Sequence, residues 1–154
     1  MKAYNDDPAI KAEFLRLAAE HEAEDRLRPG RYWQMVDGQW KGCAVGCTIR
    51  SWETMCGTWF EDDPVNNHFR YEAFGVPEAV AVLEDDIFER LPPGRQRTWP
   101  REFLAAIPVG ADLGYVADLF RAREGDVCPY TPTPMQADAL LALLRAAGTE
   151  AGDR

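Results

Sequence analysis

The stretch 41–50 constrains the fold of this chain more than any other. It reads Lys-Gly-Cys-Ala-Val-Gly-Cys-Thr-Ile-Arg, so two glycines and two cysteines each repeat at a spacing of four. In a helix, residues four apart share a face, so Gly42 and Gly46 would form one stripe and Cys43 and Cys47 the next. A strand is compatible with these residue types, but the spacing favours a helix.

Two glycines within one helical turn require an explanation, because each costs about 1 kcal/mol relative to alanine. Close approach of another element would supply one. We therefore interpret Gly42, Cys43, Gly46 and Cys47 as a small-residue seam, on which a hairpin and a later helix close. Replacement of Gly46 by leucine should then destabilise the whole fold.

The composition is that of a globular protein. The 154 residues are 46% hydrophobic and 28% charged, a composition that suggests neither a disordered nor a membrane protein. We expect one globular helical domain over residues 1–148 and a frayed tail over 149–154. No secretory signal and no apolar run of about 20 residues is present, so we expect a cytoplasmic protein.

The net charge indicates which partners the chain can attract, and the cysteines indicate its redox environment. A formal net charge of −9 at pH 7 disfavours nucleic acid and anionic membranes, and it favours a protein partner with a basic surface. The four cysteines are expected to be reduced thiols rather than a disulfide framework.

The hydrophobic pattern predicts a mainly α fold, namely a single-domain helical bundle with a small β-hairpin near residues 31–43. Asp37-Gly38, between two strand-like runs, is the hairpin signal. Caps, prolines and apolar periodicity predict helices over 8–27, 43–49, 67–74, 76–91, 98–107, 113–120 and 134–148.

The segment 51–67 is the least regular part of the sequence, and it carries the candidate partner surface. Aromatic anchors beside an acidic rim suit a basic partner. These residues are Trp52, Trp59, Phe60, Glu61, Asp62 and Asp63. The alternative interpretation is that the aromatic residues belong to the core.

The cysteines allow two further hypotheses. Cys43, Cys47, Cys56 and His68 form a Cys3His set of the kind that binds structural zinc, although their spacing is not that of a common zinc module. Alternatively, Cys43 at a helix N-terminus beside a lysine would have a lowered pKa and act as a reactive thiol.

No specific sequence motif supports an enzymatic function. Phosphate loops, nucleophile elbows and His-Glu-x-x-His signatures are absent. Glu84, Asp85, Asp86 and Glu89 could act as acids and bases, but such runs are usually solvated helix faces. His21, at the end of an apolar stripe, is interpreted as a half-buried packing residue.

Four segments together resemble an uncharacterised family of small bacterial and phage proteins. They are Lys-Gly-Cys-Ala-Val-Gly-Cys-Thr-Ile at 41–49, Tyr-Glu-Ala-Phe-Gly-Val-Pro at 71–77, Leu-Glu-Asp-Asp-Ile-Phe-Glu at 83–89 and Ala-Ile-Pro-Val-Gly-Ala-Asp-Leu at 106–113. The resemblance covers roughly residues 1–119 and implies no activity. Relative to its pattern, 51–67 looks like an insertion.

The sequence thus leads to two functional hypotheses. The first is a non-enzymatic protein without a cofactor that acts through protein–protein contact, as a phage or mobile-element type of regulator or inhibitor of a nucleic-acid-handling complex. The alternative is a cysteine-ligated metal-binding protein or a thiol redox protein.

Overall fold

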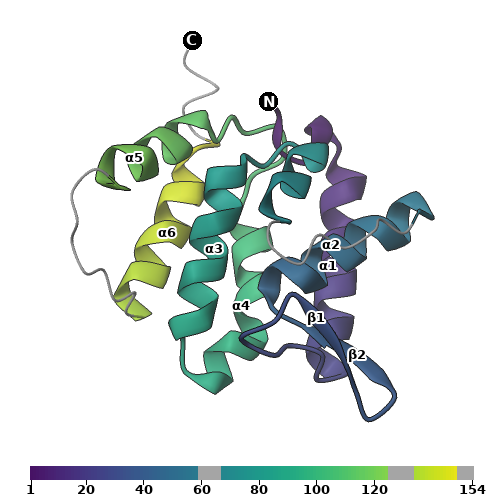
Figure 1. Ribbon diagram of the computed structural model, residues 1–154. Coiled ribbons are helices and arrows are strands. Elements are labelled where there is room, and N and C mark those ends of the chain that lie inside the picture. The colour runs from purple at the N-terminus through teal and green to yellow at the C-terminus, as the bar shows by residue number, and fades with distance from the viewer. Residues whose placement is uncertain (59–66, 125–133, 149–154) are drawn as a thin grey trace.

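The computed structural model describes residues 1–58, 67–124 and 134–148. It confirms a mainly helical fold with one small antiparallel hairpin (Figure 1). In chain order the elements are the 3-10 helix η1 (Ala3–Asp6), α1 (Pro8–Ala23), the strands β1 (Trp33–Val36) and β2 (Gln39–Gly42), α2 (Ala44–Cys56), the 3-10 helix η2 (His68–Phe74), α3 (Glu78–Arg90), α4 (Pro93–Ala106), α5 (Gly114–Glu124) and α6 (Pro134–Ala146).

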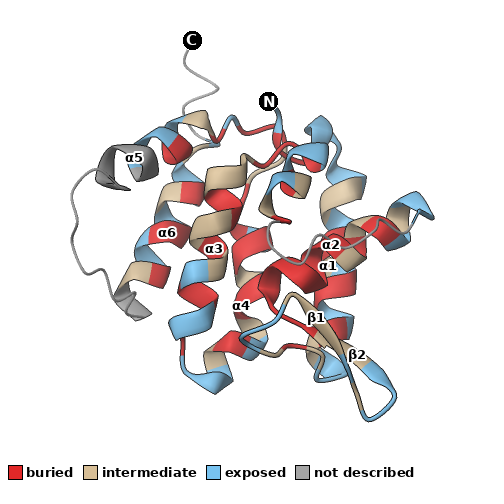
Figure 2. Cartoon of the chain, in the orientation of Figure 1, coloured by how far each residue is buried: buried red, intermediate tan, exposed pale blue. Residues whose placement is uncertain are grey.

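Helix α4 is the centre of the packing. It contacts α1, α2, α3 and α6, and the buried faces of these helices turn towards one another (Figure 2). Its side chains Trp99, Phe103 and Leu104 are almost completely removed from water. Arg97, Arg101 and Ala105 form the exposed face of this helix, and burial of its opposite, apolar face contributes to stability.

The hairpin forms where the Asp-Gly turn predicts it. Trp33 pairs with Gly42 and Val36 with Gln39. Asp37 and Gly38 both have positive φ, 50° and 77°, as a two-residue hairpin turn requires.

A third extended segment joins the other edge of β2. Arg28 N–H donates to the carbonyl of Gly42 at 2.7 Å, and Gly42 N–H donates to the carbonyl of Arg26 at 2.9 Å. The predicted helix over 8–27 is therefore too long, because the chain leaves α1 after Ala23 to make this pairing.

Two other predicted boundaries are wrong. The helix expected from residue 98 starts at Pro93, because proline at the first helical position is already set to a helical φ. Pro100 lies inside α4 rather than at its start. Helix α2 continues to Cys56, so the first part of the segment that we expected to be irregular is helical, and it ends at Gly57 with a positive φ of 67°.

Gly42 and Gly46 lie against the backbone of Tyr32, the residue that precedes β1 in the sequence. A Cβ added at either Gly42 or Gly46 would collide with the carbonyl oxygen of Tyr32. Cys43 N–H donates to the carbonyl of Arg31 at 2.9 Å, in the same contact. The start of α2 is thus packed on main-chain atoms, which cannot move aside as a flexible side chain can.

We expect Gly46→Ala to lower the free energy of unfolding by about 1–3 kcal/mol, because the new methyl group would displace the Tyr32 carbonyl. Gly94→Ala is the matched control, since a Cβ there meets nothing within 4 Å. Urea unfolding followed by circular dichroism measures both variants. Equal stability of the two would contradict the close contact.

Candidate functional site

An apolar hollow of about 420 Å³ opens between α2 and η2. Among the described residues its lining consists of Trp52, Phe69, Arg70 and Ala73. Phe69 is 48% exposed, a large fraction for an aromatic ring. The hollow therefore exposes an aromatic ring beside a half-buried tryptophan, and aromatic rings of this kind are enriched at protein interfaces.

The Trp52 side chain forms the rigid base of this hollow. Its ring stacks on Phe14 with centroids 6.1 Å apart and an interplanar angle of 6°, and it lies 5.6 Å from the ring of Phe74. Because Phe14 and Phe74 are fully buried, Trp52 joins the core on one side and remains half-buried on the other.

Only part of the predicted partner surface can be placed. Trp52 contributes to the hollow, whereas Trp59, Phe60, Glu61, Asp62 and Asp63 lie outside the described residues. The sequence interpretation did not identify Phe69 as a surface residue. The signal for it was the pattern of η2 itself, in which Tyr71 and Phe74 are the core-facing positions.

Two side-chain contacts hold η2 on α3. Tyr71 donates its phenolic hydrogen to Glu84 Oε2 at 2.5 Å, and His68 Nε2 lies 3.0 Å from Asp85 Oδ2. The acceptors are consecutive residues of α3, so both contacts fix the same region of η2.

Glu84 is fully buried, which corrects the expectation that this carboxylate run is a solvated face. Burial raises the pKa of Glu84 well above its ordinary value, the negative charge of Asp85 adds to the effect, and the Tyr71 hydrogen bond opposes it. Glu84 lies four residues after Val80 and three before Ile87, on the buried stripe of α3. This spacing was the sequence signal for its burial.

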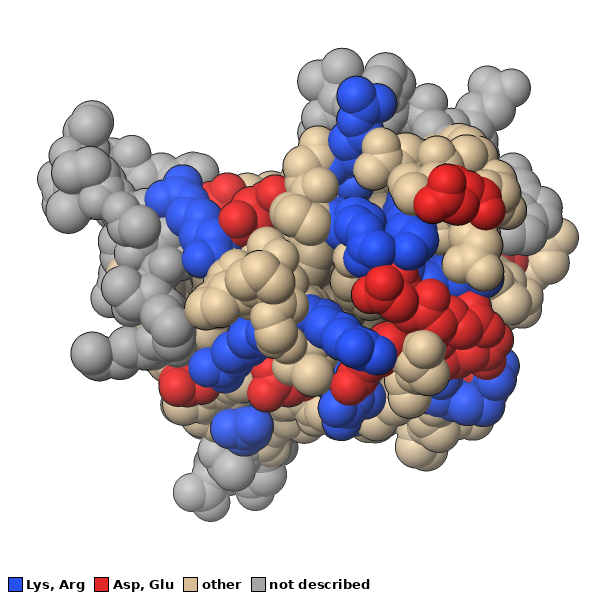
Figure 3. Space-filling view, turned by 90° about the horizontal axis from the view of Figure 1, so that it is seen from below, with Lys and Arg blue, Asp and Glu red and all other residues tan. Residues whose placement is uncertain are grey.

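Charges of both signs cover the face that is seen from below in Figure 3, and basic and acidic side chains lie next to each other there. Several such neighbours in the structure are ion pairs. Arg28 lies 3.0 Å from Asp25, and Arg101 lies 2.7 Å from Glu22. Pairing of this kind neutralises much of the basic charge that an anionic polymer would need.

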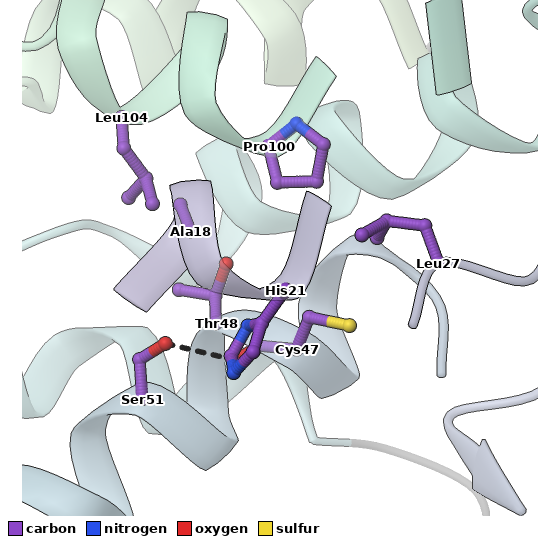
Figure 4. A pocket seen from close by; sticks show the side chains of 8 residues that line it. All are labelled: Ala18, His21, Leu27, Cys47, Thr48, Ser51, Pro100 and Leu104. Carbon is purple, nitrogen blue, oxygen red and sulfur yellow. Dashed lines mark hydrogen bonds between the residues drawn. The ribbon is translucent and has the colours of Figure 1, made fainter. Parts of the chain in front are cut away.

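His21 is one of eight residues that line a second, smaller pocket (Figure 4). Its other lining residues are Ala18, Leu27, Cys47, Thr48, Ser51, Pro100 and Leu104. The pocket has no space for a water molecule. The hydroxyl of Ser51 is already used, because Ser51 Oγ donates to the carbonyl of Cys47 at 3.1 Å. The His21 ring packs edge-on against Trp40, with centroids 5.0 Å apart. This pocket is packed core.

The cysteines of the seam are buried rather than activated. Cys43 is the N-cap of α2, and its sulfur accepts from Gly46 N–H at 3.4 Å. Burial and the charge of Asp85 raise the pKa of the Cys43 thiol well above its ordinary value. The expected lowering of this pKa is therefore wrong, because desolvation outweighs the helix N-terminus.

The proposed zinc ligands have other neighbours. Cys47 Sγ donates to the carbonyl of Gly42 at 3.6 Å, Cys56 is exposed, and His68 contacts Asp85. Within the described ranges, no group of three or more His, Cys, Asp or Glu side chains could hold a metal ion. The zinc alternative stays a prediction.

Comparison with protein-family models, with curated proteins and with solved structures found no match. The resemblance noted in the sequence stays a prediction. None of the helices within 1–58, 67–124 and 134–148 has the length and apolar character that crossing a bilayer requires.

We expect the free energy of unfolding to decrease in acid because of His21. Burial lowers the pKa of His21 from 6.5 to about 4, so the unfolded chain takes up a proton first as the pH falls. The stability contribution is complete above pH 6.5, and roughly 3 kcal/mol is lost as the pH falls to about 4. Urea unfolding across this range measures it.

The control for this prediction uses the second histidine. His21→Phe, which keeps a ring against Trp40, should lose this part of the pH dependence, whereas His68→Gln should retain it. A chemical shift of the His21 ring that titrates near 6.5 in the folded protein would contradict the prediction.

Thiol labelling provides a second prediction. In a Cys128→Ser background at neutral pH, a chromogenic disulfide reagent should react rapidly with Cys56 alone, because Cys56 is exposed. Burial raises the pKa of Cys47 to about 12, and Cys43 is similarly protected. Adding Cys56→Ser should abolish the fast phase, and a fast phase that survives would refute thiol burial.

Proposed function

We propose that this chain acts through contact with a protein partner, which inserts an apolar side chain into the hollow between Trp52 and Phe69. The exposed Phe69 ring carries this proposal, because it lies beside a half-buried tryptophan that the core holds in place. Partially exposed aromatic residues on a rigid base are the usual anchors of protein interfaces.

The charge of the chain supports a partner with a basic surface. A net charge of −9 attracts such a surface over long distances and accelerates association at low salt. Nucleic-acid-handling proteins carry basic surfaces of this kind. We therefore propose that the chain regulates or inhibits such a complex in the cytoplasm, where its cysteines would stay reduced.

A photo-crosslinking amino acid at position 69 tests this proposal. Phe69→benzoylphenylalanine should crosslink to a defined protein in cells that express the chain. The matched control is the same substitution at Tyr115, which is 50% exposed on α5. Identification of the captured protein shows whether its surface is basic.

Affinity for the captured protein provides the quantitative test. Phe69→Ala should weaken binding about tenfold or more, as expected for an anchor residue, whereas Tyr115→Ala should not. Raising the salt concentration should slow association. No capture at position 69, or equal capture at both positions, would overturn the proposal.

A further inference from the structure

The 3-10 helix η2 has two functions in the structure. His68 and Tyr71 contact α3, while Phe69, Arg70 and Ala73 line the hollow. Residues three apart in a 3-10 helix lie above one another, which explains how His68 and Tyr71 share a face. Three of the described lining residues therefore depend on how η2 is seated on α3.

The deeper of the two attachments is the Tyr71–Glu84 hydrogen bond. Glu84 is 0% exposed, and its Oε2 accepts from Tyr71 at 2.5 Å. Its second oxygen, Oε1, has no hydrogen-bond partner within the described residues. Trp99 Nε1 donates to the backbone carbonyl of Glu84, at 3.2 Å, and leaves the carboxyl group untouched.

No cation lies among the titratable groups whose interaction with Glu84 the structure shows. These are Tyr4 in η1, Cys47 in α2, Tyr71 in η2 and Asp85 in α3. A carboxylate at this position would therefore be both desolvated and repelled by Asp85. Glu84 consequently keeps its proton while η2 is seated.

We propose that the proton on Glu84 is a latch that regulates the partner hollow. With Glu84 protonated, η2 is seated on α3 and the hollow is formed; loss of this proton releases η2 together with Phe69, Arg70 and Ala73. The latch rests on the proposed function, because it regulates the same hollow.

A rise in pH should favour release of η2, because Glu84 has a higher pKa when η2 is seated than when it is released. Once η2 has moved away, water reaches Glu84 and its pKa returns to the ordinary value of 4.5, whereas the seated state keeps the proton to a much higher pH. Above pH 4.5, each pH unit should therefore favour opening by up to about tenfold, until Glu84 also ionises in the seated state.

Amide hydrogen exchange of the free chain tests the latch. Val76 N–H, which donates to the carbonyl of Tyr71 at 3.1 Å, reports on η2, and Glu24 N–H, which donates to Glu20 at 2.9 Å, reports on α1. Between about pH 5.5 and 8, the protection factor of Val76 should fall by up to tenfold per pH unit while that of Glu24 falls less.

Two variants identify the group responsible. Glu84→Gln, a neutral isostere, should abolish the pH dependence at Val76, whereas Glu72→Gln, at an exposed position of η2 itself, should leave it unchanged. If Glu84→Gln does not fold, Tyr71→Phe is the alternative. This variant removes a bond that lowers the pKa of Glu84, so the pH dependence should persist and extend to higher pH.

The latch is overturned if protection at Val76 does not change with pH, if Glu84→Gln retains the change, or if Val76 and Glu24 fall in parallel, which would indicate global unfolding. Exchange is measured without a partner. A failed crosslink at Phe69 would therefore overturn the proposed function without contradicting the pH-dependent release of η2. Unchanging protection at Val76 would overturn the latch without contradicting the proposed function.

Discussion

The carbonyl oxygen of Tyr32 lies where Gly42 and Gly46 come together, and the arrangement of the first half of the chain depends on this contact. It brings the hairpin, the segment after α1 and the start of α2 within backbone contact of one another. Van der Waals packing at this distance tolerates no Cβ atom. Further along α2, the same placement brings Trp52 onto Phe14 and so creates the base of the hollow.

Local signals in the sequence were sufficient for most elements. The Asp37-Gly38 turn predicted the hairpin. The four-residue spacing after residue 41 predicted a helix, although this helix begins only at Ala44 and Gly42 is the last residue of β2. The errors occurred where tertiary contacts override local signals. Pairing of β2 with residues 26–28 shortens α1, and a proline that would normally start a helix lies within α4, where packing on four neighbouring helices compensates for its missing N–H group.

The candidate site was less predictable than the fold. Trp52 was identified from its residue type, but its partner Phe69 comes from a different element, and only the packing of η2 decides that this ring faces water. Glu84 was assigned to solvent because runs of carboxylates are usually solvated helix faces. Its burial beside Tyr71 raises its pKa, and residue type alone does not reveal this environment.

The anchoring of Tyr4 links burial of the N-terminal segment to the presence of α4. Its hydroxyl donates to the carbonyl of Leu104 across a sequence separation of 100 residues, and Ala3 N–H donates to the carbonyl of Ala111. During synthesis on the ribosome, Ala3 and Tyr4 are made before α4, so they can reach these partners only after α4 has emerged. Contacts of such long range slow folding. Until then Tyr4 can use its local contact with Phe14, whose ring lies 5.8 Å away in α1.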